Sequence, residues 1–354
     1  MMHLNRKTFE KAAASEGLSA EQTARLWQRL VAGSGAAPAF RAAHILYYLG
    51  GFVAISAISL FVTMAWDTWS GWPMLILALC LAMAGTALAE KFLSQGHRIP
   101  AGIAVTFAVA TVPLVIYSLQ HILGFWTGRS HAPDFHRYID WRWYFMEMGT
   151  LATAAVALWR YRLPFIMFVV AVVFWYLSMD LVPLIDGGRG TWESYWELRR
   201  LVTVIMGVLT LLLAFWIDVR SGRQEDFSFW LYIVGVMMLW GGVTATSSHS
   251  EWHRLLYAVF NLGLIVVGAI LMRRVFAVFG AIGLLLYLGH LARLFATSLM
   301  FPVVLAVIGL AIIYAGIWWQ KNEHALHARL VRLLPGPIRN LIEQIHDQDV
   351  NRMD

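Results

Sequence analysis

The chain has 354 residues, of which 59% are hydrophobic and 14% are charged, and its mean hydropathy is +0.63. Soluble domains contain roughly 45–50% apolar and 25% charged residues, so this composition excludes a single soluble domain and predicts helices that cross a membrane. The formal charge of +6 does not indicate nucleic-acid binding, because the basic residues gather at the ends of apolar runs, where they set membrane topology and meet anionic lipid headgroups.

Residues 1–32 are predicted to form a cytoplasmic helical hairpin. Ser19 followed by Gln22 fits a capping box, and Gly17 suits the end of the preceding helix. Residues 33–43, which include GSGAAPA, form a flexible linker. The hairpin is too short to bury a core alone, so we expect residues 5–31 to pack on the membrane domain, on a membrane partner protein or on a second copy of the chain.

Residues 44–320 are predicted to contain ten transmembrane helices, which makes the expected fold class an all-α polytopic membrane protein. A helix needs about 20 apolar residues to cross the hydrocarbon core. Nine runs have no Asp, Glu, Lys or Arg: 45–66, 68–89, 99–128, 163–179, 201–217, 227–250, 255–272, 275–292 and 294–320. A tenth span, 142–159, contains Glu147 but is otherwise largely apolar. The single cysteine, Cys80, lies in the second span and excludes an intrachain disulfide and a CxxC motif.

The distribution of basic residues predicts that both termini are cytoplasmic. With ten alternating spans, most of the 27 Lys and Arg residues fall on the side of the N-terminus, including the short turns WRYR (159–162) and RR (273–274). This is the positive-inside pattern. Tryptophans gather beside the loops of the other face, where an amphipathic ring suits the headgroup region. Segment 191–200 (TWESYWELRR) is expected to be a short interfacial helix there.

The C-terminal segment, residues 321–354, is predicted to be a cytoplasmic amphipathic tail. In HALHARLVRLL (324–334) the leucines share one side of a helix and the arginines lie on or near the other. Pro335-Gly336-Pro337 interrupts this helix before a second short one at 338–345. We expect the tail to lie on the lipid headgroups, and residues 324–345 are the alternative candidate for binding a membrane partner protein.

The phrase GLSAEQTARL (17–26), the linker, and a glycine-led first span, YYLGGFVAISAISLF (47–61), together resemble a broad bacterial family of polytopic membrane proteins of unknown function. Members of that family share a short cytoplasmic helical preface. The resemblance is one of layout. It implies a multi-pass protein of the bacterial inner (cytoplasmic) membrane and implies no catalytic residues.

Five polar side chains within the apolar spans are candidates for lining a cavity, because ionisable groups in hydrocarbon are costly. They are Glu147, Asp180, Asn261, His290 and Arg293. Asn261 is favoured as an interhelical hydrogen-bonding residue and Arg293 as one that reaches the outer headgroups. Glu147 is too short to reach the headgroups easily, and a water-filled vestibule opening outward would satisfy it together with His290 or Arg293. Pro113 and Gly280, Gly283 and Gly289 mark places where helices can bend or pack closely.

A metal site is a weaker hypothesis, built on SSHSEWHR (247–254). An extended backbone would place His249, Glu251 and His253 on one side, with His131 and His136 from the 123–141 loop completing the ligand set. On a helix Glu251 points away from the two histidines, and the HExxH order is absent. We therefore favour a solvated connection between two helices over metal binding or proton relay.

Three functions follow from these patterns. The favoured one is a transporter or permease for a small solute or ion, which uses an outward-opening polar vestibule. The alternative is a non-catalytic membrane subunit or scaffold that binds partner proteins. The third is a membrane enzyme acting on envelope or lipid-linked substrates. The sequence contains no nucleotide loop, GxSxG elbow or HExxH motif, so it points to no catalytic residue and no cofactor.

The predicted topology is tested by reporter fusions after residues 160 and 190. One span, 163–179, separates these positions, so a periplasm-dependent reporter should be active at residue 190 and inactive at residue 160. Equal activity at both positions would contradict the ten-span arrangement.

Overall fold

The structure is a computed structural model that describes residues 42–65, 71–126, 141–186, 192–221, 226–245 and 250–294, with Trp69 and scattered residues of 9–26 and 300–321. Every secondary-structure element in these ranges is a helix, which confirms the all-α fold class. The elements are α3 (Ala42–Ala65), α4 (Trp72–Ser94), α5 (Arg98–Ala110), α6 (Val112–Ile122), α7 (Trp141–Tyr161), η2 (Pro164–Ile166), α8 (Met167–Asp186), α9 (Trp192–Ser221), α10 (Phe229–Thr244), α11 (Glu251–Leu271) and α12 (Arg274–Leu294).

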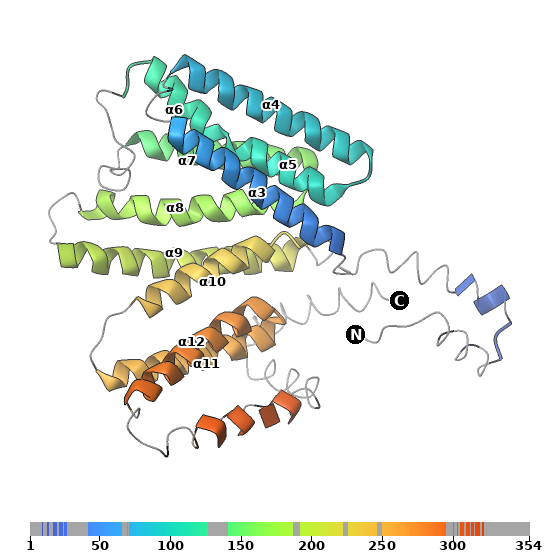
Figure 1. Ribbon diagram of the computed structural model, residues 1–354, viewed down its shortest axis with the longest axis vertical. Coiled ribbons are helices and arrows are strands. Elements are labelled where there is room, and N and C mark those ends of the chain that lie inside the picture. Colours follow the sequence, from blue (N-terminus) through green and yellow to red (C-terminus); the bar gives the residue numbers. More distant parts are fainter. Residues whose placement is uncertain are drawn as a thin grey trace.

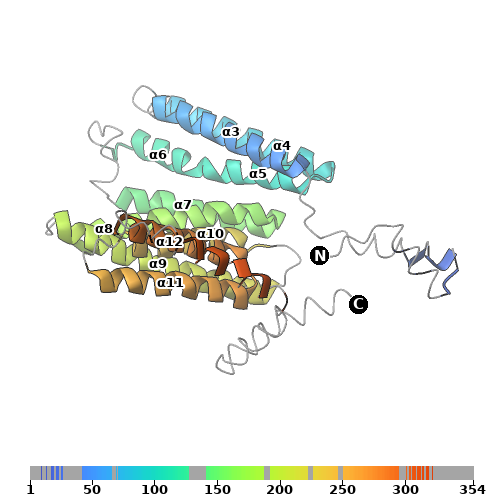
Figure 2. The same cartoon turned by 60° about the horizontal axis from the view of Figure 1, so that its bottom comes forward.

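From α4 onward the helices run up and down side by side, with connections alternating between the two ends of the bundle (Figures 1 and 2). Tryptophans 72, 141 and 192 begin α4, α7 and α9 at one end, called here the tryptophan end. Arginines 98 and 274 begin α5 and α12 at the opposite end, called the arginine end. This alternation is the arrangement that short connections between antiparallel helices produce.

Six helical segments are long and apolar enough to cross a membrane: Trp72–Ser94, Arg98–Ile122, Pro164–Asp186, Ser194–Arg220, Glu251–Leu271 and Arg274–Leu294. The chain therefore has the character of a membrane-embedded protein. The other four predicted spans coincide with helices that are shorter or less apolar, namely the Leu46–Ala57 part of α3, α7, α10 and Leu305–Trp318. Length and composition thus support six spans and leave the count of ten unconfirmed.

The third predicted span is divided into α5 and α6 at Thr111, two residues before Pro113. Proline lacks the N–H for the helical ladder and its ring clashes with the preceding turn, so the predicted bend is confirmed. Residues 192–200 differ from the prediction of a separate short helix, because they form the beginning of α9, which runs without a break from Trp192 to Ser221. Their arginines and tryptophans share helical spacing with the apolar residues that follow, which lets one helix continue through both.

The interior consists of two apolar clusters. The first joins α4, α5, α7 and α8 around residues such as Ala101, Val105 and Ala154. The second joins α8, α9, α10, α11 and α12 around Leu231, Val236 and Met238. The single cysteine, Cys80, lies on α4, and its side chain is exposed. Because α8 contributes to both clusters, it connects the two halves of the bundle.

Near the N-terminus the structure describes part of the predicted hairpin. The Ser19 N–H donates to Gln22 Oε1 at 3.0 Å and the Gln22 N–H donates to Ser19 Oγ at 3.3 Å. Gly17 has a φ of 75°, the left-handed conformation that ends a helix. The capping box and the helix stop are therefore confirmed, while residues 27–41 and the tail from 322 lie outside the described residues.

Arg273, in the turn between α11 and α12, ties these helices to α9 and α10 at the arginine end. Its guanidinium contacts Asp218 Oδ1 of α9 and Asp226 Oδ2 of the α9–α10 connection, each at 2.5 Å, and donates to Ser228 Oγ at 3.0 Å. Tyr232 of α10 donates to Asp218 Oδ2 at 3.3 Å, and its ring lies under the guanidinium. This group of side chains is called the Arg273 clasp.

The clasp keeps Arg273 charged although it is mostly covered. Burial lowers the pKa of the guanidinium, but the hydrogen bonds and negative charges of Asp226 and Asp218 outweigh burial and hold the pKa above its ordinary value. The side chain of Asp218 is 5% exposed. Loss of the arginine would therefore leave a buried carboxylate without its counter-charge.

We expect Arg273→Ala to lower the free energy of unfolding by about 3–5 kcal/mol, because it leaves Asp218 charged and unpaired. Thermal unfolding of the purified protein in mild detergent measures this loss. The matched control is Arg274→Ala, since Arg274 is adjacent and exposed. Equal transition temperatures for the two variants would show that the clasp does not hold the helices together.

Candidate functional site

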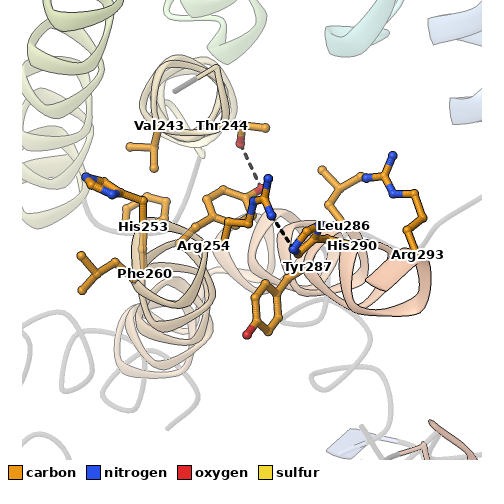
Figure 3. Close-up of a pocket in the computed structure, with 11 residues that line it drawn as sticks. Val243, Thr244, His253, Arg254, Phe260, Leu286, Tyr287, His290 and Arg293 are labelled. Carbon is orange, nitrogen blue, oxygen red and sulfur yellow. Dashed lines mark hydrogen bonds between the residues drawn. The ribbon is translucent and has the colours of Figure 1, made fainter. Parts of the chain in front are cut away.

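A pocket of about 500 Å³ opens between the last turn of α10, the first turns of α11 and the last turns of α12, at the tryptophan end (Figure 3). Arginine, histidine, tyrosine and threonine side chains share its wall with aliphatic ones. Its lining residues are Val243, Thr244, His253, Arg254, Leu256, Tyr257, Phe260, Leu286, Tyr287, His290 and Arg293. A concave, mostly apolar site with a few convergent polar groups is typical of small-molecule binding.

Helical spacing explains why these side chains converge. On α11, Arg254 and Tyr257 are three residues apart and therefore share a face. On α12, Leu286 and His290 are four apart, and Arg293 follows three later. The N-terminus of α11 is set at Ser250, whose extended backbone carbonyl accepts the N–H groups of His253 and Arg254. Two antiparallel helices thus present their polar stripes to each other near one end of the bundle.

Arg254, Glu251 and His290 form the polar centre of the pocket. One guanidinium nitrogen of Arg254 lies 2.5 Å from Glu251 Oε1 and 2.7 Å from His290 Nε2. Arginine can only donate, so Nε2 accepts this bond in a neutral His290 whose proton is on Nδ1. The same Nε2 lies 3.3 Å from Glu251 Oε2. The imidazole is therefore placed between an arginine donor and a carboxylate.

The charge balance of the lining favours an anion. Arg254 is shared with Glu251, but no described carboxylate pairs with Arg293. The hydroxyl groups of Thr244 and Tyr257 lie 3.1 Å apart across the α10–α11 wall. Arg293 thus adds a positive charge that no carboxylate of the described residues balances, beside several hydrogen-bonding groups. Arginine binds carboxylate and phosphate groups through two parallel hydrogen bonds.

A second polar group, the Glu147–Asp180 pair, lies between α7 and α8, away from the pocket. Glu147 is 8% exposed and Asp180 is 5% exposed. Their carboxyl groups lie within hydrogen-bonding reach of each other, and Arg199 of α9 adds a positive charge on the Asp180 side. The Tyr144 hydroxyl donates to the backbone oxygen of Asp180 at 2.7 Å and so joins the two helices.

The candidates from the sequence therefore separate into three places. His290, Arg293 and His253 line the pocket, and Glu251 contacts it through Arg254 and His290. Glu147 lies beside Asp180, and not beside His290 or Arg293 as expected, because α7 packs on α8 and α6 while α12 packs on α11 and α10. The single vestibule that would satisfy all of them is not observed.

Asn261 takes the interhelical role favoured for it. It is completely buried, its Oδ1 accepts the indole N–H of Trp240 on α10 at 3.0 Å, and its amide donates to the Tyr257 carbonyl at 2.7 Å. Gly283 of α12 faces the amide so closely that a Cβ there would overlap it. Gly280 also lies against the α11 backbone, so close packing is confirmed at both glycines, whereas Gly289 faces open space and the expectation for it is wrong.

The metal hypothesis is only partly covered by the described residues. His249, His131 and His136 lie outside them. Within the described ranges, no three His, Cys, Asp or Glu side chains come together as a metal-binding group. Glu251 and His253 both begin α11, a helix, so they do not adopt the extended backbone that the hypothesis required.

Sequence reasoning missed Arg254, Thr244 and Tyr257. Arg254 was assigned to a solvated connection between helices because it precedes a long apolar run. Its spacing of three from both Glu251 and Tyr257 is the signal that would have placed it on the polar face of α11. The partner helix that supplies His290 is not visible from that spacing.

Comparisons with models of known protein families, with curated proteins and with solved structures found no match for this chain. The resemblance in layout to a bacterial membrane protein family therefore stays a sequence-based expectation. The functional argument rests on the geometry of the described residues.

The close packing around Asn261 yields a matched pair of substitutions on α12. We expect Gly283→Ala to lower the free energy of unfolding by about 1–3 kcal/mol, because the new methyl group overlaps the Asn261 amide. Gly289→Ala should be neutral or slightly stabilising, since it meets no atoms and alanine favours helix. Thermal unfolding in detergent compares the two, and a loss that is equal for both would contradict the assignment.

Proposed function

We propose that this chain is a ten-span membrane permease that binds a small organic anion in the pocket between α10, α11 and α12. The observation that carries the proposal is the convergence of Arg254, Arg293 and His290 in one cavity of about 500 Å³. A volume of this size suits a small molecule. The aliphatic and aromatic part of the lining, Leu256, Phe260 and Leu286, favours a solute with an apolar body and one carboxylate.

The position of the pocket at the tryptophan end supports a site that faces outward. The positive-inside pattern assigns the arginine end to the cytoplasm, so the tryptophan end, with the pocket, faces outward. The same assignment requires α3, α7, α10 and Leu305–Trp318 to cross as the remaining four spans. For α10 this is a short crossing, because 16 residues of helix extend about 24 Å.

The packing of α11 and α12 supports a role in movement. Inside the bundle these two helices are the least covered of the six long spans. They pack mainly on each other, and α12 packs on α10. A helical hairpin that is joined to the rest of the bundle by the Arg273 clasp and by a few contacts with α10 is suited to rigid-body motion, which alternating access requires.

A partner-binding membrane subunit remains the second candidate function, and one observation favours it. Large apolar side chains such as Leu256, Leu262, Leu285 and Leu286 are exposed on the α11–α12 hairpin. In a bilayer such a surface faces lipid or another protein. The segments proposed for partner binding, residues 5–31 and 324–345, lie largely outside the described residues.

Uptake of short-chain carboxylates by vesicles containing the purified protein tests the permease proposal. We expect Arg254→Gln and Arg293→Gln each to reduce uptake and affinity roughly 10- to 100-fold, since a hydrogen bond to a charged group contributes about 1.5–3 kcal/mol. The matched control is Arg220→Gln, which removes an arginine at the arginine end, where the guanidinium lies over the Trp216 ring. Uptake that is unchanged in both pocket variants would refute the proposal.

A further inference from the structure

The Glu147–Asp180 pair lies at one depth inside the bundle. Glu147 is six residues after Trp141, the first residue of α7, and Asp180 is six residues before Asp186, the last residue of α8. At 1.5 Å per residue, both carboxyl groups are about 9 Å inside the tryptophan end. They are too short to reach the headgroups from this depth, so the protein itself must satisfy them.

The hydrogen bonding around Glu147 is incomplete for an ionised side chain. Both carboxyl oxygens are fully covered, and none of the described residues donates a hydrogen bond to either one. The hydroxyl groups of Tyr144 and Thr150, each three residues from Glu147 on α7, are already donated to the backbone oxygens of Asp180 and Met146. What Glu147 does face is the carboxyl group of Asp180. Two carboxylates cannot bond to each other, but a carboxylic acid and a carboxylate can.

The surrounding charges distinguish the two members of the pair. The positive charge of Arg199 on α9 acts on Asp180 and is not among the charges that act on Glu147. The remaining helices packed on α7 supply no further charge at this depth. On α6 the titratable side chains are Tyr117 and His121, whose rings lie against each other, and Tyr117 lies against Trp126. On α5 the only one is Arg98, at the arginine end.

We propose that Glu147 and Asp180 form a proton-binding site within the bundle, where Glu147 carries the proton and donates it to the Asp180 carboxylate. A single proton removes the repulsion between two adjacent buried carboxylates and supplies the missing donor. No third Asp, Glu, His or Cys of the described residues joins the pair. A divalent cation would require more oxygen ligands than the pair offers.

This site is separate from the anion pocket and does not depend on the proposed permease function. A proton held inside the membrane part of a bundle is typical of proteins that couple to, or respond to, the proton gradient. Release of the proton would leave two negative charges between α7 and α8. The Tyr144 bond and the Arg199 charge are then the contacts that change most.

Infrared spectroscopy of the full-length protein in lipid vesicles tests the proposal, because a protonated carboxyl group has a C=O band that a carboxylate lacks. At neutral pH the wild-type protein should show this band, and titration to high pH should remove it. Glu147→Gln should abolish the band, since Asp180 beside Arg199 then ionises. Asp180→Asn should keep the band but shift its frequency, because the acceptor of the Glu147 proton has changed.

Glu251→Gln is the matched control, because it removes a carboxylate that pairs with Arg254 and should leave the band unchanged. The amide variants have nearly the same volume as the native side chains, and their elution as single species in detergent checks that they fold. Absence of the band in the wild-type protein would overturn the proposal, whatever the behaviour of the variants. A band unaffected by both Glu147→Gln and Asp180→Asn would also overturn it.

Discussion

The contact between Arg273 and its two aspartates determines where the α11–α12 hairpin lies. Arg273 belongs to the turn of the hairpin, while Asp218 and Asp226 come from the end of α9 and from the connection to α10. Apolar packing alone positions the hairpin poorly, because its surface is largely exposed and lipid competes for it as well as protein does. Lipid does not compete in this way for an ion pair between specific side chains. This contact therefore also fixes the positions of the two helices that form the pocket at their other end.

Elsewhere among the described residues the buried polar side chains form hydrogen bonds within or between helices, with the exception of Thr106 Oγ1. The hydroxyl groups of Thr150, Thr203 and Thr210 each donate to the carbonyl of the residue four positions earlier. Asn261 uses both ends of its amide, one within α11 and one across to α10. Glu147 differs from these residues, because the polar group beside it is another carboxyl group, that of Asp180. Both of its carboxyl oxygens are buried without a hydrogen-bond donor among the described residues, which is the observation behind the proposed proton site.

Most of the helices could be predicted from the sequence, but only some residues of the candidate site could. Uninterrupted apolar runs predicted the helices, and Pro113 predicted the break between α5 and α6. His290 and Arg293 were identified because an ionisable side chain in an apolar run is conspicuous. Arg254 was missed since it lies at the edge of such a run, where charges are usual. Asp218 was missed for the same reason. Its hydrogen-bond partners Ser228, Tyr232 and Arg273 lie 10, 14 and 55 positions further along the chain, and only the packing of the helices brings them together.

The predicted pairing of Glu147 with His290 or Arg293 failed for a related reason. Hydropathy carries no information on which helices are neighbours. Six of the spans could be recognised by length and composition, whereas α7 and α10 are marginal. Helix α7 carries Glu147 among its apolar residues, and α10 has only 16 residues.

Cys80 lies about halfway along α4, on an exposed face of a helix whose apolar side chains surround it. In a bilayer that face meets acyl chains, which water-soluble alkylating agents do not enter. The native thiol is thus a chemical marker of immersion: small lipid-soluble reagents can modify it in the folded protein, and charged ones gain access once α4 leaves the membrane. Because it is the sole sulfhydryl in the sequence, a fluorescent or spin label attached there reports from one defined position without engineering of the chain.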